Sequence, residues 1–276
     1  MSFARPHIES IDASRTAFEI DDAALSTFRE QGFLRLESVF EPDEVAVLSD
    51  ELDRLIDEWA HESMGWSGDW REEYLDPDQR EATSLIAMHD LQQYSEPYLR
   101  MVSDPRLVTP VAQIVGGDAE LHHSTLHAKP PDEGTPFPMH QDWAFYKHHG
   151  SPLQYVDALV HVDDVPPERG PLRFVEGSHQ QGALEHIEGE GQTPHLPTDE
   201  YPLEEATEVP AEAGDVILMS YHTIHGSRQN RAESMRRLVR VGYRDPANEQ
   251  FEGQALDRDG VIVAGRERAG VDGGEN

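Results

Sequence analysis

The sequence predicts a mainly β protein with flanking helices, built on a double-stranded β-helix core of the jelly-roll or cupin-like kind. Apolar side chains before Gly116 recur at helical spacing. After Gly117 the chain changes to short strand-like runs divided by turns that contain Pro and Gly. Several short strands at this spacing are typical of a sandwich or barrel. The runs are 121–128, 135–140, 154–162, 172–175, 215–221 and 238–243.

The first part of the chain is expected to hold a polar arm, a short helix, an apolar strand, an amphipathic helix, a loop and a set of helical segments. Their ranges are 1–22, 22–32, 33–36, 41–60, 61–82 and 84–115. The amphipathic helix has the clearest start, because Pro42 and Glu44 suit a first turn. The last range should be interrupted at Pro97, Pro105 and Pro110.

We expect one domain in the 276 residues, since two independent cores are less natural at this length. Residues 1–115 would form the arm and supporting helices, 116–246 the jelly-roll core and 247–276 a tail. Residues 183–213 are acidic and contain proline, so we interpret them as an insertion between strands. This insertion and the 61–82 segment are candidates for shielding a site from water.

Charge is the outlying property of the composition. Asp and Glu total 54 against 22 basic residues, which gives a net charge of −32, and Lys129 and Lys147 are the only lysines. An acidic, lysine-poor surface needs screening counter-ions, so we favour a halophilic protein over an ordinary acidic bacterial one. The same surface repels nucleic acid and anionic lipid, and neither is expected as a partner.

Several classes of site and location are excluded by what the sequence lacks. There is no cysteine, so disulfides, thiolate metal sites and a cysteine nucleophile are excluded. Met1 to Ile20 contains no apolar core of a signal peptide, and no stretch approaches the roughly 18 apolar residues of a membrane span. We therefore expect a cytoplasmic monomer or homodimer that acts on a small-molecule substrate.

The pair His140 and Asp142, followed later by His225, is the strongest functional signal in the chain. Two imidazoles and one carboxylate can occupy one face of an Fe(II) octahedron and leave three adjacent positions for an organic chelate and dioxygen. On a strand, positions i and i+2 project to the same side, so His140 and Asp142 can point together. By itself an HxD pair is weak evidence in a chain with 15 histidines, where a hydrogen-bonded surface histidine is the simpler interpretation.

The combination of motifs is more specific than any single one. The chain resembles the phytanoyl-CoA dioxygenase family of Fe(II)/2-oxoglutarate oxygenases, which also contains ectoine hydroxylases, from about residue 28 to residue 243. The motifs that carry the resemblance are Gln31-Gly32-Phe33, Lys129-Pro130-Pro131, His140-Gln141-Asp142-Trp143, the 170–179 block, Gly214-Asp215, His225-Gly226-Ser227, Asn230 and Arg236-Arg237.

The resemblance implies a role for each matching position. His140, Asp142 and His225 match the iron ligands, which are also the catalytic residues. Arg236 matches the arginine that pairs with the C5 carboxylate of 2-oxoglutarate, and Ser227 matches the hydroxyl that assists it. A guanidinium suits this task because its planar fork meets a carboxylate with two parallel hydrogen bonds. His222 competes with His225 for the second imidazole ligand, and the eleven-residue spacing to Arg236 favours His225.

Residues around this set are assigned less directly. His127 sits where relatives place a polar residue near the cosubstrate, and Phe137 is a candidate for packing against the carbon chain of 2-oxoglutarate. His123 and Trp143 are candidates for the substrate side. For each of these aromatic and imidazole side chains, core packing is the competing interpretation.

Two expectations concern the charged neighbours of Arg236. Arg237 should face the opposite side of its strand and serve structure or solvent, whereas Arg240 should share the face of Arg236 only if a bulge intervenes. Some relatives direct an upstream lysine at the cosubstrate, and residues 86–88 of this chain offer none.

The reaction that the resemblance implies is hydroxylation of an unactivated C–H bond of a small organic substrate, with 2-oxoglutarate and O2 consumed and succinate and CO2 released. Three rival classes stay open on sequence alone. A zinc hydrolase can also use two histidines and an aspartate but would not need Arg236, and a cupin-like protein can bind metal without turnover. A purely structural β-sandwich is the third, and it gives no reason for the spaced His, Ser and Arg.

Overall fold

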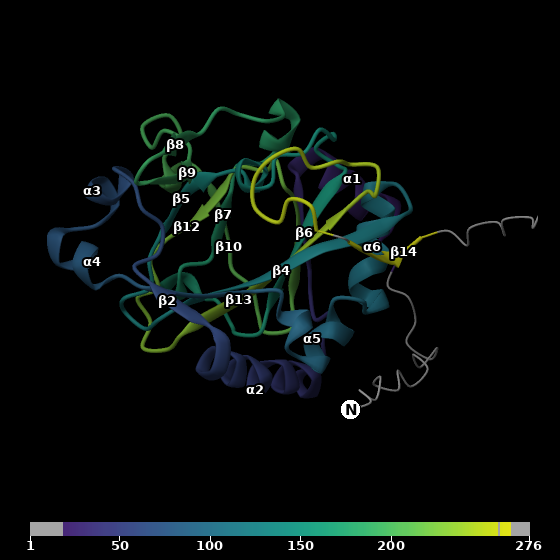
Figure 1. Ribbon diagram of the computed structural model, residues 1–276, viewed down its shortest axis with the longest axis horizontal. Coiled ribbons are helices and arrows are strands. Elements are labelled where there is room, and N and C mark those ends of the chain that lie inside the picture. The colour runs from purple at the N-terminus through teal and green to yellow at the C-terminus, as the bar shows by residue number, and fades with distance from the viewer. Residues whose placement is uncertain (1–18, 259, 266–276) are drawn as a thin grey trace, which may run out of the picture.

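The computed structural model describes residues 19–258 and 260–265, which form two antiparallel sheets with helices against the larger one (Figure 1). The larger sheet has the order β1-β11-β6-β13-β4-β3-β2, with β14 beside β4. Its strands are β1 (Phe33–Leu36), β2 (His61–Ser63), β3 (Leu85–His89), β4 (Ala119–Lys129), β6 (Tyr155–His161), β11 (Val216–Ser220), β13 (Arg236–Arg244) and β14 (Val261–Ala264).

The smaller sheet has the order β10-β7-β12-β5, and a separate hairpin pairs β8 with β9. These strands are β5 (Phe137–His140), β7 (Leu172–Phe174), β8 (Ile187–Gly189), β9 (Gln192–His195), β10 (Thr207–Val209) and β12 (His225–Ser227). Leu159 and Ile217 of the larger sheet pack with Leu172 and Phe174 of the smaller one, so the two sheets enclose a common apolar layer. The predicted jelly-roll fold class is confirmed.

Six α-helices and five short 3₁₀ turns complete the described residues. The helices are α1 (Asp22–Gln31), α2 (Pro42–Trp59), α3 (Trp70–Tyr74), α4 (Pro77–Ala82), α5 (Glu96–Met101) and α6 (Pro105–Val115). The 3₁₀ turns are η1 (Leu91–Gln93), η2 (Asp142–Phe145), η3 (Pro167–Arg169), η4 (Ser178–Gln181) and η5 (Leu203–Glu205). The α2 helix begins where predicted, because Glu41, just before Pro42, and Glu44, in the first turn, form a reciprocal capping box. Among these described helices, none is both long and apolar enough to cross a membrane.

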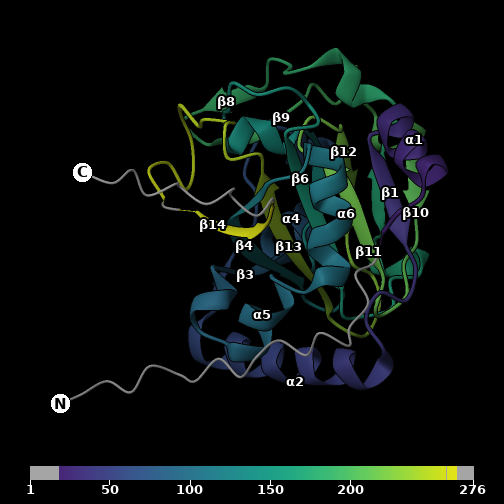
Figure 2. The same ribbon diagram turned by 90° about the vertical axis from the view of Figure 1, so that its right-hand side faces the viewer.

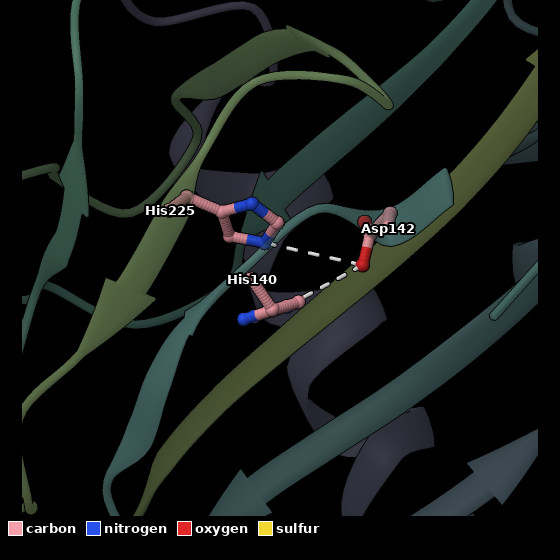
Figure 3. Close-up of side chains that lie close together, drawn as sticks. All are labelled: His140, Asp142 and His225. Carbon is pink, nitrogen blue, oxygen red and sulfur yellow. Dashed lines mark ion pairs between the residues drawn. The ribbon is translucent and has the colours of Figure 1, made fainter. Parts of the chain in front are cut away.

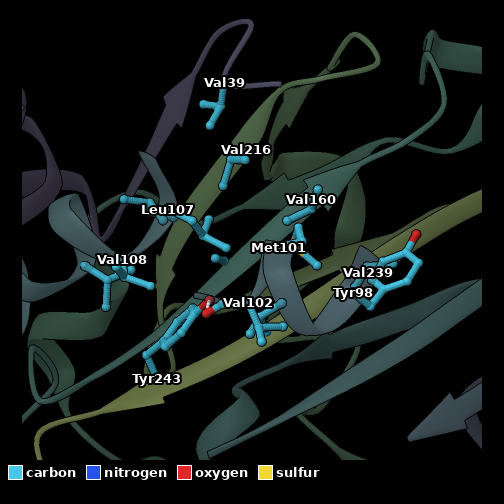
Figure 4. Close-up of a cluster of buried hydrophobic side chains, with 14 of the residues drawn as sticks. Val39, Tyr98, Met101, Val102, Leu107, Val108, Val160, Val216, Val239 and Tyr243 are labelled. Carbon is cyan, nitrogen blue, oxygen red and sulfur yellow. Dashed lines mark hydrogen bonds between the residues drawn. The ribbon is translucent and has the colours of Figure 1, made fainter. Parts of the chain in front are cut away.

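The alternation of side chains on β6 shows how one strand serves two environments. Val156, Ala158 and Val160 face the helices and join the main hydrophobic core, in which α6 lies along the sheet (Figures 2 and 4). The residues between them face the smaller sheet: Asp157 and Leu159 are both buried there. Side chains on a strand point alternately to its two faces. Burial of Val156, Ala158 and Val160 against the helices therefore places Asp157 and Leu159 on the face toward the smaller sheet.

Some predicted boundaries were wrong. The β core is not confined to residues 116–246, because β1, β2, β3 and β14 extend the larger sheet on both sides of that range. Residues 85–89, expected to be helical, pair with β4 as a strand in which Leu85 and Met88 are buried. Pro110 lies inside α6 without ending it. The 61–82 segment holds one strand and two helices, and 183–213 contains β10, a member of the smaller sheet.

Candidate metal centre

His140, Asp142 and His225 converge at one end of the smaller sheet (Figure 3). Their ligand atoms lie within 4.8 Å of one another, and all three side chains are buried. The Oδ1 atom of Asp142 is 3.5 Å from Nε2 of His140 and 3.9 Å from Nε2 of His225. The two histidines come together because β5 and β12 pair with His140 opposite His225.

Gly226 allows this close pairing. A Cβ atom at this position would lie 2.8 Å from the carbonyl oxygen of Phe137 and 2.9 Å from Sδ of Met139. Both atoms belong to the neighbouring strand β5. Glycine between His225 and Ser227 therefore lets β12 approach β5 closely enough for the two imidazoles to meet.

Asp142 reaches the site differently from the way the sequence suggested. It is not on the strand with His140: β5 ends at His140 and Asp142 is the first residue of the 3₁₀ turn η2. The expectation of two neighbours on one strand face was therefore wrong in its local structure, although the convergence itself is present. The carboxylate depends on the turn, and on what holds the turn, for its position.

Backbone contacts orient both imidazoles for metal binding. Nδ1 of His140 lies 2.9 Å from the carbonyl oxygen of Pro138, and Nδ1 of His225 lies 3.0 Å from that of Thr223. A carbonyl only accepts, so each Nδ1 carries the proton and each Nε2 presents a lone pair to the centre. This donor set, two neutral imidazoles and one carboxylate, fits Fe(II).

The charge states match the same assignment. Burial lowers the pKa of His225 to about 3, with His140 adding to the effect, so the ring is neutral at physiological pH. Burial alone would raise the pKa of Asp142, but Arg240 and the two histidines outweigh it and hold that pKa well below its usual value. The centre therefore offers the negative charge of Asp142 beside the neutral ring of His225.

Arg236 is the second notable feature of the site. Its side chain is fully buried, and within the described chain its Nε, Nη1 and Nη2 atoms have no hydrogen-bond partner. Burial lowers the pKa of this guanidinium to about 10, which still leaves it charged at neutral pH. A buried, charged and unpartnered fork is costly unless an anion satisfies it. It therefore fits a bound carboxylate, as the resemblance implied for 2-oxoglutarate.

Lys129 is a basic residue beside this position that the sequence reasoning missed, and burial, followed by the charge of Arg236, holds its pKa well below the usual value. It is fully buried opposite Arg236 in the β4–β13 pairing, and its Nζ donates to Oγ of Ser227 at 2.7 Å and to the carbonyl oxygen of Arg228 at 2.8 Å. The Nζ atom also lies 4.4 Å from the centre of the Phe137 ring. One signal was available, because Lys129 is one of two lysines in the whole chain and opens the Lys129-Pro130-Pro131 motif.

Ser227 and Phe137 both contact Lys129, and His127 lies beside Phe137. Since Lys129 donates to Oγ of Ser227, the hydroxyl proton of Ser227 is free to donate to a ligand. His127 is partly buried and lies 5.5 Å from Phe137 between ring centres. Burial, followed by the charge of Arg240, lowers the pKa of His127 to about 3, so its ring is neutral.

The candidates for the substrate side are placed less favourably. His123 is buried, and its Nε2 accepts from Nη2 of Arg240 at 2.6 Å, so this atom is already used inside the protein. Trp143 donates from Nε1 to the carbonyl oxygen of His148, and its ring lies 6.0 Å from that of His222. Neither contact reaches the three converging residues.

Trp66 and Phe145 instead pack against His140, with ring centres at 4.6 Å and 5.9 Å. Trp66 also contacts Phe137 at 4.7 Å and Phe145 at 5.0 Å. It comes from the 61–82 segment that was expected to shield the site, but no residue in that segment had been singled out. The rings of Trp66 and Phe145 therefore cover the imidazole of His140.

The two arginines that follow Arg236 divide between the faces of β13. Arg237 pairs with Asp163 and Asp53 on the outer face, as predicted for a structural residue. Arg240 faces inward with Arg236, and the β13 register is continuous between them. The expectation that Arg240 needs a bulge to share this face was wrong, because residues four apart on a strand already project to the same side.

Together, the jelly-roll scaffold, the face of two imidazoles and one carboxylate, and the empty guanidinium fork define a non-haem Fe(II)/2-oxoglutarate-dependent dioxygenase. The phytanoyl-CoA dioxygenase (PhyH) family matches residues 28–238, and the chain belongs to this family.

Known proteins resemble the chain over most of its length. It is 29% identical over 228 residues to an ectoine dioxygenase of Bordetella parapertussis, covering 75% of this chain and 69% of the relative. The carbocyclase SnoK from nogalamycin biosynthesis superposes with a TM-score of 0.69 at 22% identity, over 85% of this chain and 88% of SnoK. EctD from S. alaskensis, solved with 2-oxoglutarate and 5-hydroxyectoine, superposes with a TM-score of 0.64 at 22% identity, over 89% of this chain and 82% of EctD.

Proposed function

We propose that this enzyme hydroxylates an unactivated C–H bond of a small organic substrate, coupled to conversion of 2-oxoglutarate and O2 to succinate and CO2. The observation that carries the proposal is the fully buried Arg236 fork, which has no partner in the described chain. Arg236 lies opposite Lys129, whose Nζ donates to Ser227 on the strand that also carries His225, one of the three converging residues. One anion that reaches both the metal and the fork satisfies both halves of the site.

Each group has a task that follows from its contacts. His140, Asp142 and His225 would hold the metal, and when bound, Fe(II) with 2-oxoglutarate and dioxygen supplies the oxidising chemistry. Arg236 would take the distal carboxylate in a bidentate pair, and Ser227 would donate its hydroxyl proton to the same group. Phe137 would pack along the carbon chain, with the neutral His127 beside it.

The aromatic side chains that lie over His140 would exclude water from the site. Trp66 and Phe145 lie over His140, and Phe145 also borders a hollow of about 490 Å³ lined by Thr193, Lys147 and Gln254 among others. We propose that substrate enters through this hollow, because Phe145 belongs both to its wall and to the surroundings of the iron ligand. A small molecule fits such a volume.

The substrate itself does not follow from the relatives. One relative is named an ectoine dioxygenase. In this chain the HxD pair is followed by Trp143-Ala144-Phe145-Tyr146, and on this segment we do not assign ectoine. We propose a small polar metabolite instead. The single-domain organisation, the halophilic origin, the cytoplasmic location and the choice between monomer and homodimer stay predictions.

The test is succinate formation by the purified enzyme with Fe(II), ascorbate and 2-oxoglutarate in molar salt, across a panel of small polar substrates. We expect one or more substrates to stimulate succinate release, and Asp142→Ala to abolish it. Zn(II) in place of Fe(II) serves as the control, because a zinc hydrolase would keep its activity with Zn(II) and ignore 2-oxoglutarate. Absence of 2-oxoglutarate binding would overturn the proposal.

A further inference from the structure

Arg240 is held by four side chains at once, which is unusual for a group so close to a metal-ligand carboxylate. Its side chain is 7% exposed. Nη1 donates to Oδ1 of Asp157 at 2.7 Å and to Oδ2 of Asp142 at 3.3 Å. Nη2 donates to Nε2 of His123 at 2.6 Å and to the hydroxyl of Tyr146 at 2.5 Å. A guanidinium is planar, so these acceptors fix both its position and its orientation.

The acceptors are themselves held in place. Nδ1 of His123 lies 3.1 Å from Nδ1 of His122, whose Nε2 lies 3.1 Å from Oε1 of Gln250. Because Arg240 only donates, Nε2 of His123 accepts and its proton is on Nδ1, pointing toward His122. The Tyr146 ring also lies against the guanidinium, with Cζ of Arg240 4.8 Å from its centre. The network leaves Arg240 no alternative position.

Arg240 reaches the metal centre from the opposite sheet. His140 and His225 belong to β5 and β12 of the smaller sheet, whereas Arg240 and Asp157 belong to β13 and β6 of the larger one. Asp142 lies on neither strand but at the start of η2, and Tyr146 follows the end of that turn. Arg240 donates to both Asp142 and Tyr146, so it holds both ends of the η2 turn that carries the carboxylate.

The two oxygens of Asp142 thus have different surroundings. Oδ1 faces the histidines, at 3.5 Å and 3.9 Å from their Nε2 atoms, while Oδ2 faces Nη1 of Arg240 at 3.3 Å. A carboxylate can bind a metal through one oxygen or through both. If both oxygens of Asp142 served as ligands, the protein would fill four of six octahedral positions, and a bidentate cosubstrate would take the last two.

We propose that Arg240 is a positioning residue that keeps Asp142 a one-oxygen ligand by holding Oδ2 away from the metal. Three adjacent coordination positions then stay free of protein atoms, which is one more than the cosubstrate needs. The inference rests on the proposed function, since it concerns how the same site is kept open. It assigns to Arg240 a role that neither metal binding nor cosubstrate binding requires.

The test uses nitric oxide as a probe of the free position, in anaerobic protein loaded with Fe(II) and 2-oxoglutarate. Arg240→Lys keeps the charge but loses the fork. Arg240→Met combined with Asp157→Asn removes both members of one buried ion pair, and bound Fe(II) would balance the remaining charge of Asp142. Arg237→Lys, on the outer face of the same strand, is the matched control. Thermal unfolding reports whether each variant is folded.

We expect both Arg240 variants to bind Fe(II) and 2-oxoglutarate within a few-fold of the wild type, while the affinity for nitric oxide, followed by its iron-nitrosyl EPR signal, falls roughly tenfold or more. The turnover number should fall with little change in KM for 2-oxoglutarate, and Arg237→Lys should leave every readout unchanged. A folded double variant that binds nitric oxide like the wild type would overturn the proposal.

Loss of Fe(II) binding in folded Arg240 variants would also overturn it, because Arg240 would then be needed for ligation itself and not for keeping Oδ2 free. The wild-type protein separates this inference from the proposed function. If wild-type protein with Fe(II) and 2-oxoglutarate shows no nitrosyl signal and no turnover, the proposed function fails before the variants are compared.

Discussion

The backbone amide of Thr193 donates to the carbonyl oxygen of Ser67 at 2.8 Å, and the amide of Ser67 donates back to the Thr193 hydroxyl at 3.1 Å. These residues lie 126 positions apart, in the two segments that the sequence suggested as shields. Their pairing places Trp66, the neighbour of Ser67, against His140. The two segments therefore act as one cover whose inner surface is an aromatic ring.

Trp66→Ala should open this cover. We expect metal and 2-oxoglutarate affinities to stay within a few-fold of the wild type, while hydroxylated product per succinate released falls, because water and solutes reach the oxidising centre. The measurement is the ratio of product to succinate once a substrate is known. Trp59→Ala, on the exposed face of α2, is the matched control. An unchanged ratio would show that Trp66 does not shield the site.

Arg236→Ala should weaken cosubstrate binding strongly. Truncating one member of a buried, hydrogen-bonded charge pair costs about 2–5 kcal/mol, so we expect the Kd for 2-oxoglutarate to rise at least 30-fold. Titration of 2-oxoglutarate into the Fe(II)-loaded protein measures this. Arg237→Ala removes the adjacent guanidinium, which pairs with Asp163 and Asp53, and should lower stability without changing this Kd. Equal losses in both variants would contradict the assignment.

Lys129→Met should act on the same cosubstrate through a second side chain. The methionine keeps the apolar stem over Phe137 but removes the Nζ donor that fixes the Ser227 hydroxyl. The hydrogen bond that Ser227 would donate to the charged carboxylate contributes about 1.5–3 kcal/mol, so a Kd increase of roughly 10- to 100-fold is expected, with Fe(II) affinity unchanged. Lys147→Met, at the other lysine, should leave the Kd for 2-oxoglutarate unaltered. Metal loss in Lys129→Met would indicate a structural role instead.

Sequence reasoning located the centre because several of its motifs together resemble those of a known family. His140 and Asp142 are two residues apart, and Ser227 and Arg236 follow His225 at short, specific intervals. What it missed depends on contacts between distant segments. Lys129 meets Ser227 across 98 positions, Arg240 meets Asp142 across 98, and neither contact leaves a local pattern.

Three of the errors have simpler causes. The same-face rule for strands was applied to His140 and Asp142, where the strand had already ended, and was not applied to Arg236 and Arg240, where it holds. Residues 85–89 were placed in a predicted helical range, although the periodicity of so short an apolar run cannot distinguish a strand from a helix. Pairing with β4 decides the outcome there.

The acidic surface leads to a salt prediction. With a net charge of −32, self-repulsion opposes folding, and salt shortens its range from ~10 Å at 0.1 M to ~3 Å at 1 M. The Tm should therefore rise as KCl is increased into the molar range, which thermal unfolding by circular dichroism would record. Sucrose, which stabilises proteins without screening charge, is the control solute. A Tm that is flat in KCl would argue against halophilic adaptation.

His161 allows a test of how buried neutral histidines limit acid stability. It is 1% exposed on the inner face of β6, and burial, followed by the charge of Arg236, lowers its pKa to about 3. The unfolded chain, with a pKa near 6.5, binds more protons than the folded chain between these values, so stability is full above pH ~6.5 and is lost as the pH falls toward 3. At pH 5 the loss from this one residue is about 2 kcal/mol.

His161→Gln should remove that loss, because glutamine does not titrate. Urea unfolding of the metal-free protein at pH 8 and pH 5, in constant salt, should show the variant gaining about 2 kcal/mol relative to the wild type between the two conditions, even if it is less stable at pH 8. His149→Gln, at an exposed position, controls for the removal of an imidazole. If the free energies of unfolding of His161→Gln and the wild type shifted in parallel between pH 8 and pH 5, His161 would have to be charged in the folded protein. The inner face of β6 would then hold a cation beside the buried guanidinium of Arg236, and the assignment of a neutral His161 would fail.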